Sequence, residues 1–194
     1  MQRADRRLDL ETSIDTVTPD EPSAERLRAI VDAEYDFVWR SVRRLGVADR
    51  DVDDAVQQVL LTLSRKLDLV RKGSERSFLF QIAIRVAADR RRTERRRREV
   101  MTDTVEDSAD GAPSLEALMD LRRARERLDA ILDCMSLDLR SVFTLFEIDQ
   151  MTLTEISELL GVPRGTVASR LRRAREEFTS RANQSTSKMP GGDR

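Results

Sequence analysis

The residues whose types and spacing most clearly suggest a binding function are five arginines within residues 164–175. This stretch contains no acidic residue. Arginine can bond a guanine edge bidentately, and arginine, serine and threonine can bind phosphate oxygens. The polar side chains outside the apolar stripe of this stretch are Thr166, Ser169, Arg170, Arg172 and Arg173. The pattern indicates a DNA-binding face; the alternative is an ordinary helical hairpin with a solvated arginine face.

The residues before these arginines supply what a helix-turn-helix needs. Thr152 or Thr154 can cap a short helix that ends near Leu160. Gly161 allows a tight corner, and Pro163 suits the first turn of the next helix. A helix-turn-helix places its second helix in the major groove of DNA. The sequence therefore predicts such a motif, with the arginines on its second helix.

A second arginine cluster lies at the end of an earlier helical pattern. Residues 85–98 hold eight arginines against Asp89 and Glu94, which gives a net charge of +6. This surface can contact DNA phosphates. It can also be a solvated helix C-terminus, where cations offset the helix dipole. The helix-turn-helix pattern in the same chain favours the DNA-facing interpretation.

Carboxylates cluster at residues 49–54, at the expected start of a helix, and amides follow them. One interpretation is a divalent-metal site for phosphoryl transfer, and another is simple capping of a helix N-terminus. A third is a protein-docking face that consists of Asp53, Asp54, Gln57 and Gln58. Consecutive acids on a helix point in different directions, which disfavours the metal site.

Composition excludes several classes of function. The chain of 194 residues has no histidine and one cysteine, Cys134. Histidine-dependent catalysis, histidine zinc sites and an internal disulfide are therefore excluded. No apolar run approaches the roughly 20 residues of a membrane span, and residues 1–11 show no apolar signal region. We expect a cytoplasmic protein with no metal, cofactor or small-molecule substrate.

The elements that must position these residues are all helical, because apolar residues recur at i, i+3, i+4 and i+7. The expected helices cover residues 27–45, 52–67, 77–98, 115–135, 139–148, 154–160 and 164–179. Gly46 is the expected stop of the first, and Ser77 the expected cap of the third. The predicted fold is all-α, with two small helical domains joined by a flexible acidic linker. The predicted segments are a disordered arm (1–24), a helical bundle (25–95), the linker (96–114), a helix-turn-helix domain (115–179) and a disordered tail (180–194).

Three of these segments resemble the sigma factors of bacterial RNA polymerase, most closely the small extracytoplasmic-function (ECF) group. DVDDAVQQVLLTLSRK, residues 51–66, resembles the region-two helix that docks on the polymerase clamp. SFLFQIAIRVAADRRR, residues 77–92, resembles the next helix, which melts and reads the −10 promoter element. LTEISELLGVPRGTVASRLRRAR, residues 153–175, is similar to region four, which reads the −35 element. The resemblance implies a region-two-like bundle followed by a region-four-like helix-turn-helix.

The resemblance also implies roles for individual positions. Asp54 and Gln57 stand where the family's clamp-docking residues stand, with Asp53 and Gln58 beside them. The implied −10 contacts are Phe78, Arg85, Asp89, Arg91 and Arg92. The implied −35 contacts are Arg164, Thr166, Ser169, Arg170 and Arg173. Phe78 replaces the family's usual tryptophan, and Arg85 replaces its usual asparagine.

The function that the resemblance implies is promoter recognition without catalysis. Such a protein binds the clamp and flap regions of core RNA polymerase and directs the enzyme to promoter DNA, and its usual further partner is an anti-sigma factor. The alternative is a stand-alone helix-turn-helix regulator that binds a palindrome as a dimer. An enzyme that uses the acids at 49–54 with a metal ion ranks third.

Overall fold

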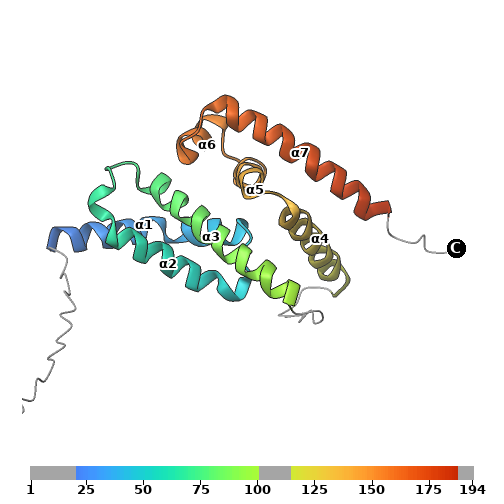
Figure 1. Cartoon of the computed structure of the whole chain (residues 1–194), viewed down its shortest axis with the longest axis horizontal. Helices are drawn as coiled ribbons and strands as arrows, with labels where there is room; N and C mark the ends of the chain where they lie inside the picture. The colour runs from blue at the N-terminus through green and yellow to red at the C-terminus, as the bar shows by residue number, and fades with distance from the viewer. Residues whose placement is uncertain (1–20, 101–114, 188–194) are drawn as a thin grey trace, which may run out of the picture.

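The structure, a computed structural model, describes residues 21–100 and 115–187, and over these residues it contains seven α-helices and no strand (Figure 1). The all-α prediction is confirmed. The helices are α1 (Glu21–Arg44), α2 (Val52–Arg65), α3 (Glu75–Val100), α4 (Leu115–Cys134), α5 (Leu137–Phe143), α6 (Leu153–Leu160) and α7 (Arg164–Ser187). We call α1–α3 the N-terminal bundle and α4–α7 the C-terminal bundle.

The N-terminal bundle forms because three amphipathic helices bury one stripe each. The buried stripe of α2 consists of Val52, Ala55, Val56, Val59 and Leu63. Across the core, the rings of Phe37 on α1 and Phe80 on α3 lie 5.9 Å apart. Gly46 and Gly73 form the two turns with φ values of +94° and +84°, a backbone conformation that favours glycine.

The C-terminal bundle contains the predicted helix-turn-helix. Thr152 caps α6, because its hydroxyl accepts from the Glu155 amide while the Glu155 carboxylate accepts from the Thr152 amide at 2.7 Å. Gly161 ends the helix in the left-handed conformation at φ +65°. The short helix α5 continues into a π-helical turn, Thr144–Ile148, where one helix was expected over 139–148.

Two helix starts differ from the prediction. α1 begins at Glu21, inside the predicted arm, because Pro22 is tolerated in the first turn of a helix. α3 begins at Glu75, so Ser77 is not its cap. The Phe78 amide donates to the carbonyl of Ser74, which starts the helical hydrogen bonding earlier than expected.

Two helix ends also differ. α3 runs to Val100, past the predicted start of the linker at residue 96, because arginine and glutamate are good helix formers. α7 runs to Ser187, into the predicted tail, and Phe178 and Ala182 pack there on the core of the C-terminal bundle. The rest of the predicted arm, linker and tail lies outside the described residues.

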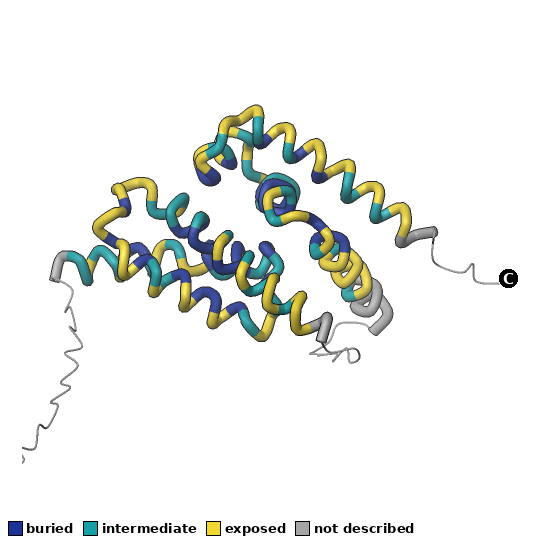
Figure 2. The backbone as a smooth tube through the Cα atoms, viewed as in Figure 1, coloured by how far each residue is buried: buried dark blue, intermediate teal, exposed yellow. Residues whose placement is uncertain are grey.

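The two bundles pack against each other, which the sequence analysis did not predict. The hydrophobic core of α1–α3 continues into residues of the C-terminal bundle, and α6 packs on α3. The buried residues that extend this core are Val142, Leu145, Ile156, Leu159, Leu160, Val167 and Leu171. Figure 2 shows the buried stretches of α3 and α5 beside the contact between the bundles.

Candidate nucleic-acid and docking interfaces

The helix-turn-helix presents one side of α7 to solvent. Val167, Leu171 and Ala174 are buried against the rest of the C-terminal bundle and fix the rotation of this helix. Because successive residues advance by 100° around a helix, the side chains between them face outward. Arg164, Ser169 and Arg173 are exposed there, Thr166 and Arg170 are half-buried, and all five lie on α7 as predicted.

One of the predicted −35 residues is held by a carboxylate of the same bundle. Arg170 Nη2 donates to Asp138 Oδ2 of α5 at 2.9 Å, with exposed side-chain fractions of 27% and 67%. Five residues farther along α7, Arg175 pairs with Glu147 at 2.7 Å and stacks over Phe146. The exposed arginine face is therefore partly neutralised by acidic residues of the same bundle.

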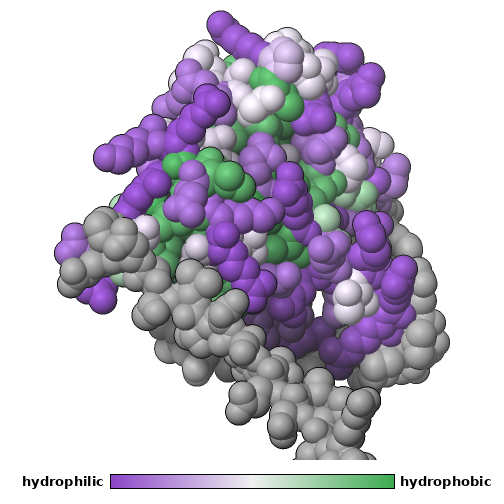
Figure 3. Space-filling view, turned by 60° about the vertical axis from the view of Figure 1, so that its left-hand side comes forward, coloured by the Kyte–Doolittle hydropathy of each residue, from purple (hydrophilic) through white to green (hydrophobic). Residues whose placement is uncertain are grey.

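The predicted docking residues lie on α2, and all four are exposed: Asp53, Asp54, Gln57 and Gln58. Beside them runs a mainly apolar groove of about 480 Å³ between α1 and α2. It is lined by Leu27, Val31, Tyr35, Asp53, Val56, Gln57, Leu60, Leu61 and Ser64. Figure 3 shows apolar surface among mostly hydrophilic side chains on the side of the molecule that lies to the left in Figure 1.

Two side chains make this groove suitable for a protein partner. Tyr35 is 42% exposed and Leu61 is 50% exposed, although both are large apolar residues. Exposed apolar area rimmed by polar groups is typical of a protein-binding surface. Asp53 and Gln57 line the same groove, so the structure brings two of the predicted docking residues to one apolar surface.

The acids at residues 49–54 do not converge on one point. Asp49 is bound by Arg43 Nε at 2.9 Å, and that hydrogen bond lowers the pKa of the Asp49 carboxyl and raises the pKa of the Arg43 guanidinium. Asp53 accepts from Trp39 Nε1 at 3.1 Å. Over the described residues there is no group of three or more candidate metal ligands. This arrangement suits surface ion pairs and capping, and gives no support to the metal interpretation.

The predicted −10 residues on α3 differ in their exposure and in their hydrogen-bond partners. Arg85, Asp89 and Arg92 are exposed, and Phe78 is half-buried against the core. The ion pairs among the described residues do not include one between Arg85 and Asp89, so Arg85 is not tied to that carboxylate. Arg91 is different, because its Nη2 donates to the backbone carbonyls of Asp133 and Met135 at 3.0 and 3.1 Å.

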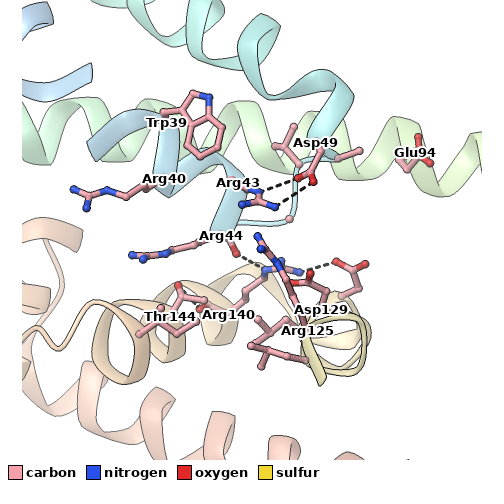
Figure 4. A pocket seen from close by; sticks show the side chains of 17 residues that line it. Trp39, Arg40, Arg43, Arg44, Asp49, Glu94, Arg125, Asp129, Arg140 and Thr144 are labelled. Atoms are coloured by element: carbon pink, nitrogen blue, oxygen red, sulfur yellow. Dashed lines mark hydrogen bonds and ion pairs between the residues drawn. The ribbon is translucent and has the colours of Figure 1, made fainter. Parts of the chain in front are cut away.

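A cavity of about 580 Å³ lies between the two bundles (Figure 4). Arg140, which sequence analysis missed, forms part of its wall and has only 3% of its side chain exposed. Its Nε donates to the carbonyl of Arg44 at 2.6 Å, and its Nη1 pairs with Asp133 Oδ1 at 2.6 Å. Burial raises the pKa of Asp129 and lowers that of Arg44 in the same cavity. The one sequence signal for Arg140 is a charged residue within an apolar stripe.

Family models match both bundles. Residues 30–97 match Sigma-70 region 2, and residues 125–178 match Sigma-70, region 4. The first match covers most of α1–α3 and the second covers most of α4–α7, in the order that the sequence predicted. Among the described residues, no helix is long and apolar enough to cross a membrane.

Two curated proteins are similar over most of the chain. The ECF RNA polymerase sigma factor SigE of Mycolicibacterium smegmatis is 26% identical over 168 residues, which are 86% of this chain and 65% of that protein. The chain thus spans slightly less than two thirds of its length. The ECF RNA polymerase sigma-E factor of Escherichia coli K12 is 30% identical over 144 residues, 70% of this chain and 75% of that protein.

Two solved structures share the fold. CnrH in complex with the cytosolic domain of CnrY has a TM-score of 0.58 and 21% identity, covering 83% of this chain and 90% of that chain. The sigma factor RpoE in complex with the anti-sigma factor NepR from Bartonella quintana has a TM-score of 0.55 and 20% identity, covering 84% and 98%. At these identities the similarity concerns the fold.

Proposed function

Because this chain belongs to the ECF sigma factors of bacterial RNA polymerase, we propose that it binds core polymerase and directs it to promoters through their −10 and −35 elements. One observation carries the proposal. A single chain exposes both an arginine-bearing second helix of a helix-turn-helix and a separate acid-and-amide face beside an apolar groove. A protein that joins an enzyme to DNA needs two such surfaces.

The proposed −35 contacts are made by α7 in the major groove. Arg164, Arg170 and Arg173 supply guanidiniums for guanine edges and phosphates, and Thr166 and Ser169 supply hydroxyls for phosphates. The proposal is supported by the buried apolar side of α7, which directs these residues outward. In this assignment the C-terminal bundle also contacts the flap region of polymerase, as the family resemblance implies.

The proposed docking face for the polymerase clamp is α2. Asp53, Asp54, Gln57 and Gln58 offer carboxylates and amides to a polar partner surface, and the groove beside them offers apolar area for burial. Apolar contact supplies affinity while the charged rim supplies orientation. The combination supports a protein partner rather than a small ligand, because the groove is bordered by the exposed side chains Tyr35 and Leu61.

The proposed −10 contacts lie on the exposed side of α3. Arg85, Asp89 and Arg92 are accessible, and Phe78 lies on the same helix nearer its start. Opening the duplex then follows from capture of unpaired bases, which costs a few kcal/mol of unstacking for each base. Arg85 in place of an amide brings a longer, cationic reach to this step. Arg91 joins the surface only when its present partners release it.

Further partners and location follow from the family. We infer that the protein acts in the cytoplasm, where polymerase and promoters are, and that an anti-sigma factor regulates it. The sigma factor RpoE of Bartonella quintana was solved with such a partner. The stand-alone regulator lacks support, because a region 2 model matches residues 30–97 in addition to the helix-turn-helix. No covalent reaction is assigned to the protein.

Transcription in vitro tests the proposal. The chain, core polymerase and fragmented genomic DNA of the encoding organism are combined, and transcript start sites are mapped. We expect a set of starts with shared −10 and −35 sequences that needs both proteins. The double variant Asp54→Ala, Gln57→Ala should lose most core binding, while Asp68→Ala, an exposed acid in the turn after α2, should bind normally. Starts without added chain, or normal binding of the double variant, would contradict the assignment.

A further inference from the structure

A pocket near the end of α3 is lined by arginines. It has a volume of about 420 Å³, and its arginines are Arg91, Arg92, Arg95 and Arg96. They are spaced three and four residues apart, so their side chains are neighbours on the surface of the helix. The rest of the lining comes from Ala88 and from residues 135–137, where α4 meets α5. The volume lies within the range of small-ligand sites, about 300–1,000 Å³.

The hydrogen-bond partners of these arginines are neutral. Arg91 Nη2 donates to the backbone carbonyls of Asp133 and Met135 at 3.0 and 3.1 Å. Arg95 Nη2 donates to the Asp133 carbonyl at 3.4 Å. The other two arginines have no hydrogen bond or ion pair to another described residue. Because each guanidinium has five N–H donors, most of the donors in the pocket are left for a ligand.

The positive charge of the pocket is not balanced. Within residues 21–100 and 115–187, no carboxylate lies at ion-pair distance from the four arginines. Glu94, the acid within this stretch of α3, pairs with Arg50 at 2.7 Å. Burial lowers the pKa of Arg91, and the positive charge of Arg140 lowers it further, although an arginine remains a cation in proteins. An anion in the pocket would therefore stabilise the charges that line it.

The ligand that fits this lining carries several charges close together. Guanidiniums bind phosphate oxygens through paired N–H donors. A DNA strand has one charge on each nucleotide, and a sugar separates successive phosphates. In a polyphosphate the phosphates are joined directly, which suits arginines that are neighbours on one helix. Ser136 also lines the pocket, and its hydroxyl, which accepts from the Leu139 amide, can still donate to a phosphate oxygen.

We propose that this pocket is a binding site for polyphosphate, either the inorganic anion or the phosphate chain of a nucleotide. The carbonyl contacts of Arg91 and Arg95 hold part of the site in place before a ligand arrives, which lowers the cost of binding. Arg92, Arg95 and Arg96 are exposed, so a ligand can enter from solvent. Arg91 and Arg92 are also proposed −10 residues, so a bound polyphosphate competes there with promoter DNA. That competition rests on the proposed function, whereas binding to the free chain does not.

Calorimetric titration of the free full-length chain tests the site. The probes are sodium triphosphate, ATP and orthophosphate at one ionic strength, without magnesium, which binds the same phosphates. We expect one triphosphate per chain and binding of orthophosphate that is weaker by about tenfold or more, because it engages fewer guanidiniums. ATP that binds more tightly than triphosphate identifies a nucleotide as the source, and similar or weaker ATP binding identifies the inorganic chain. Equal affinity for triphosphate and orthophosphate would overturn the proposal.

Two variants of Ser136 change the pocket without removing an arginine. Ser136 caps α5, and aspartate and asparagine are equally good caps, so both variants should keep the fold. Ser136→Asp brings a carboxylate to the arginines and should weaken triphosphate binding by about tenfold. Ser136→Asn brings no charge and should bind nearly as the wild type does. Equal triphosphate affinity of the two variants, with both folded by circular dichroism, would rule out the site.

Two arginine pairs separate the pocket from the general charge of α3. Arg92→Gln with Arg96→Gln removes two charges from the lining and should weaken triphosphate binding by about tenfold or more. Arg85→Gln with Arg97→Gln removes two exposed charges of the same helix outside the lining, and should have a smaller effect because salt screens exposed charges. Equal losses in the two pairs would contradict a defined site.

A short duplex of arbitrary sequence, titrated into the same variants, shows whether DNA is the true occupant. The proposal expects the difference between Ser136→Asp and Ser136→Asn to be larger for triphosphate than for the duplex. A difference that appears only with the duplex would assign the pocket to DNA and overturn the proposal. Failure of the proposed function is distinguishable, because it shows as absent binding to core polymerase while the titrations of the free chain still apply.

Discussion

Replacing Asp138 with asparagine should strengthen binding to the −35 element. Among the proposed −35 residues, Arg170 is held in the free protein by a carboxylate, because Asp138 Oδ2 lies 2.9 Å from Arg170 Nη2. That pair must break before Arg170 reaches DNA. An asparagine side chain has nearly the same shape as aspartate and no charge, so the substitution releases Arg170 more readily and removes a carboxylate that repels phosphates.

The magnitude follows from the exposure of the pair. With 27% and 67% of the two side chains exposed, the pair belongs to the surface class, worth about 0.2–1 kcal/mol. Its removal should therefore tighten −35 binding by about 1.4- to 5-fold. The same substitution should lower the stability of the C-terminal bundle by about 0.3–1 kcal/mol, because it removes a negative charge from the first turn of α5.

The assay is equilibrium binding of the reconstituted holoenzyme to a mapped promoter fragment, measured for wild type and variants at several salt concentrations. Glu147→Gln is the matched control, because it releases Arg175, an arginine five residues farther along α7 that has no proposed −35 role. Equal effects of Asp138→Asn and Glu147→Gln would refute the reasoning, since the gain would then reflect net charge alone. Unchanged binding in Asp138→Asn would remove Arg170 from the −35 surface.

Three further predictions follow from single positions. Arg85→Ala should reduce permanganate-detected strand opening and lower the salt slope of promoter binding by about one unit, with little change in melting temperature because Arg85 is exposed. Phe80→Ala should destabilise the chain by about 3–5 kcal/mol in chemical denaturation, because Phe80 is 1% exposed and faces Phe37. Thr152→Ala should lower the melting temperature at neutral pH; hydrogen bonds from Thr152 hold the pKa of Glu155 below its ordinary value. The part of the cap that depends on the Glu155 carboxylate is therefore complete above the ordinary glutamate pKa and lost as pH falls through the depressed one. The difference in melting temperature between wild type and variant should therefore narrow in acid without vanishing, because the Thr152 hydroxyl still accepts from the Glu155 amide.

The helix-turn-helix was predictable because its determinants are local. A threonine followed three residues later by glutamate specifies the capping box of α6, and glycine at the corner supplies the positive φ that the structure shows. The apolar spacing of Val167, Leu171 and Ala174 then fixes which side of α7 faces outward. None of these features depends on residues far away in the chain.

Arg140 was not predictable for the opposite reason. Its partners, Arg44 and Asp133, lie 96 and 7 positions away, and a buried guanidinium is tolerated only when its donors are satisfied. No pattern near Arg140 announces which helix end it will cap. The packing of the two bundles was not predictable for the same reason. An apolar stripe indicates that one side of a helix is buried, but it does not indicate which other helix covers it.

The charge of the basic end of α3 does not indicate which of its arginines face solvent and which contact the C-terminal bundle. At 100° per residue, Ser77, Gln81, Arg91 and Arg95 fall on one side of the helix, and these are the side chains that donate to the C-terminal bundle. The next side carries Phe78, Arg85, Asp89 and Arg92. The remaining side, which includes Leu79, Ala83 and Val86, is buried in the N-terminal bundle.

The net charge of +6 over residues 85–98 is therefore divided between two sides of α3 that have different surroundings. One side of α3 faces solvent and exposes Arg85 and Arg92, two of the proposed −10 residues. On the other side, Arg91 and Arg95 donate to backbone carbonyls of the C-terminal bundle. Because both surfaces lie on one rigid helix, any DNA segment that binds the first is brought beside the second.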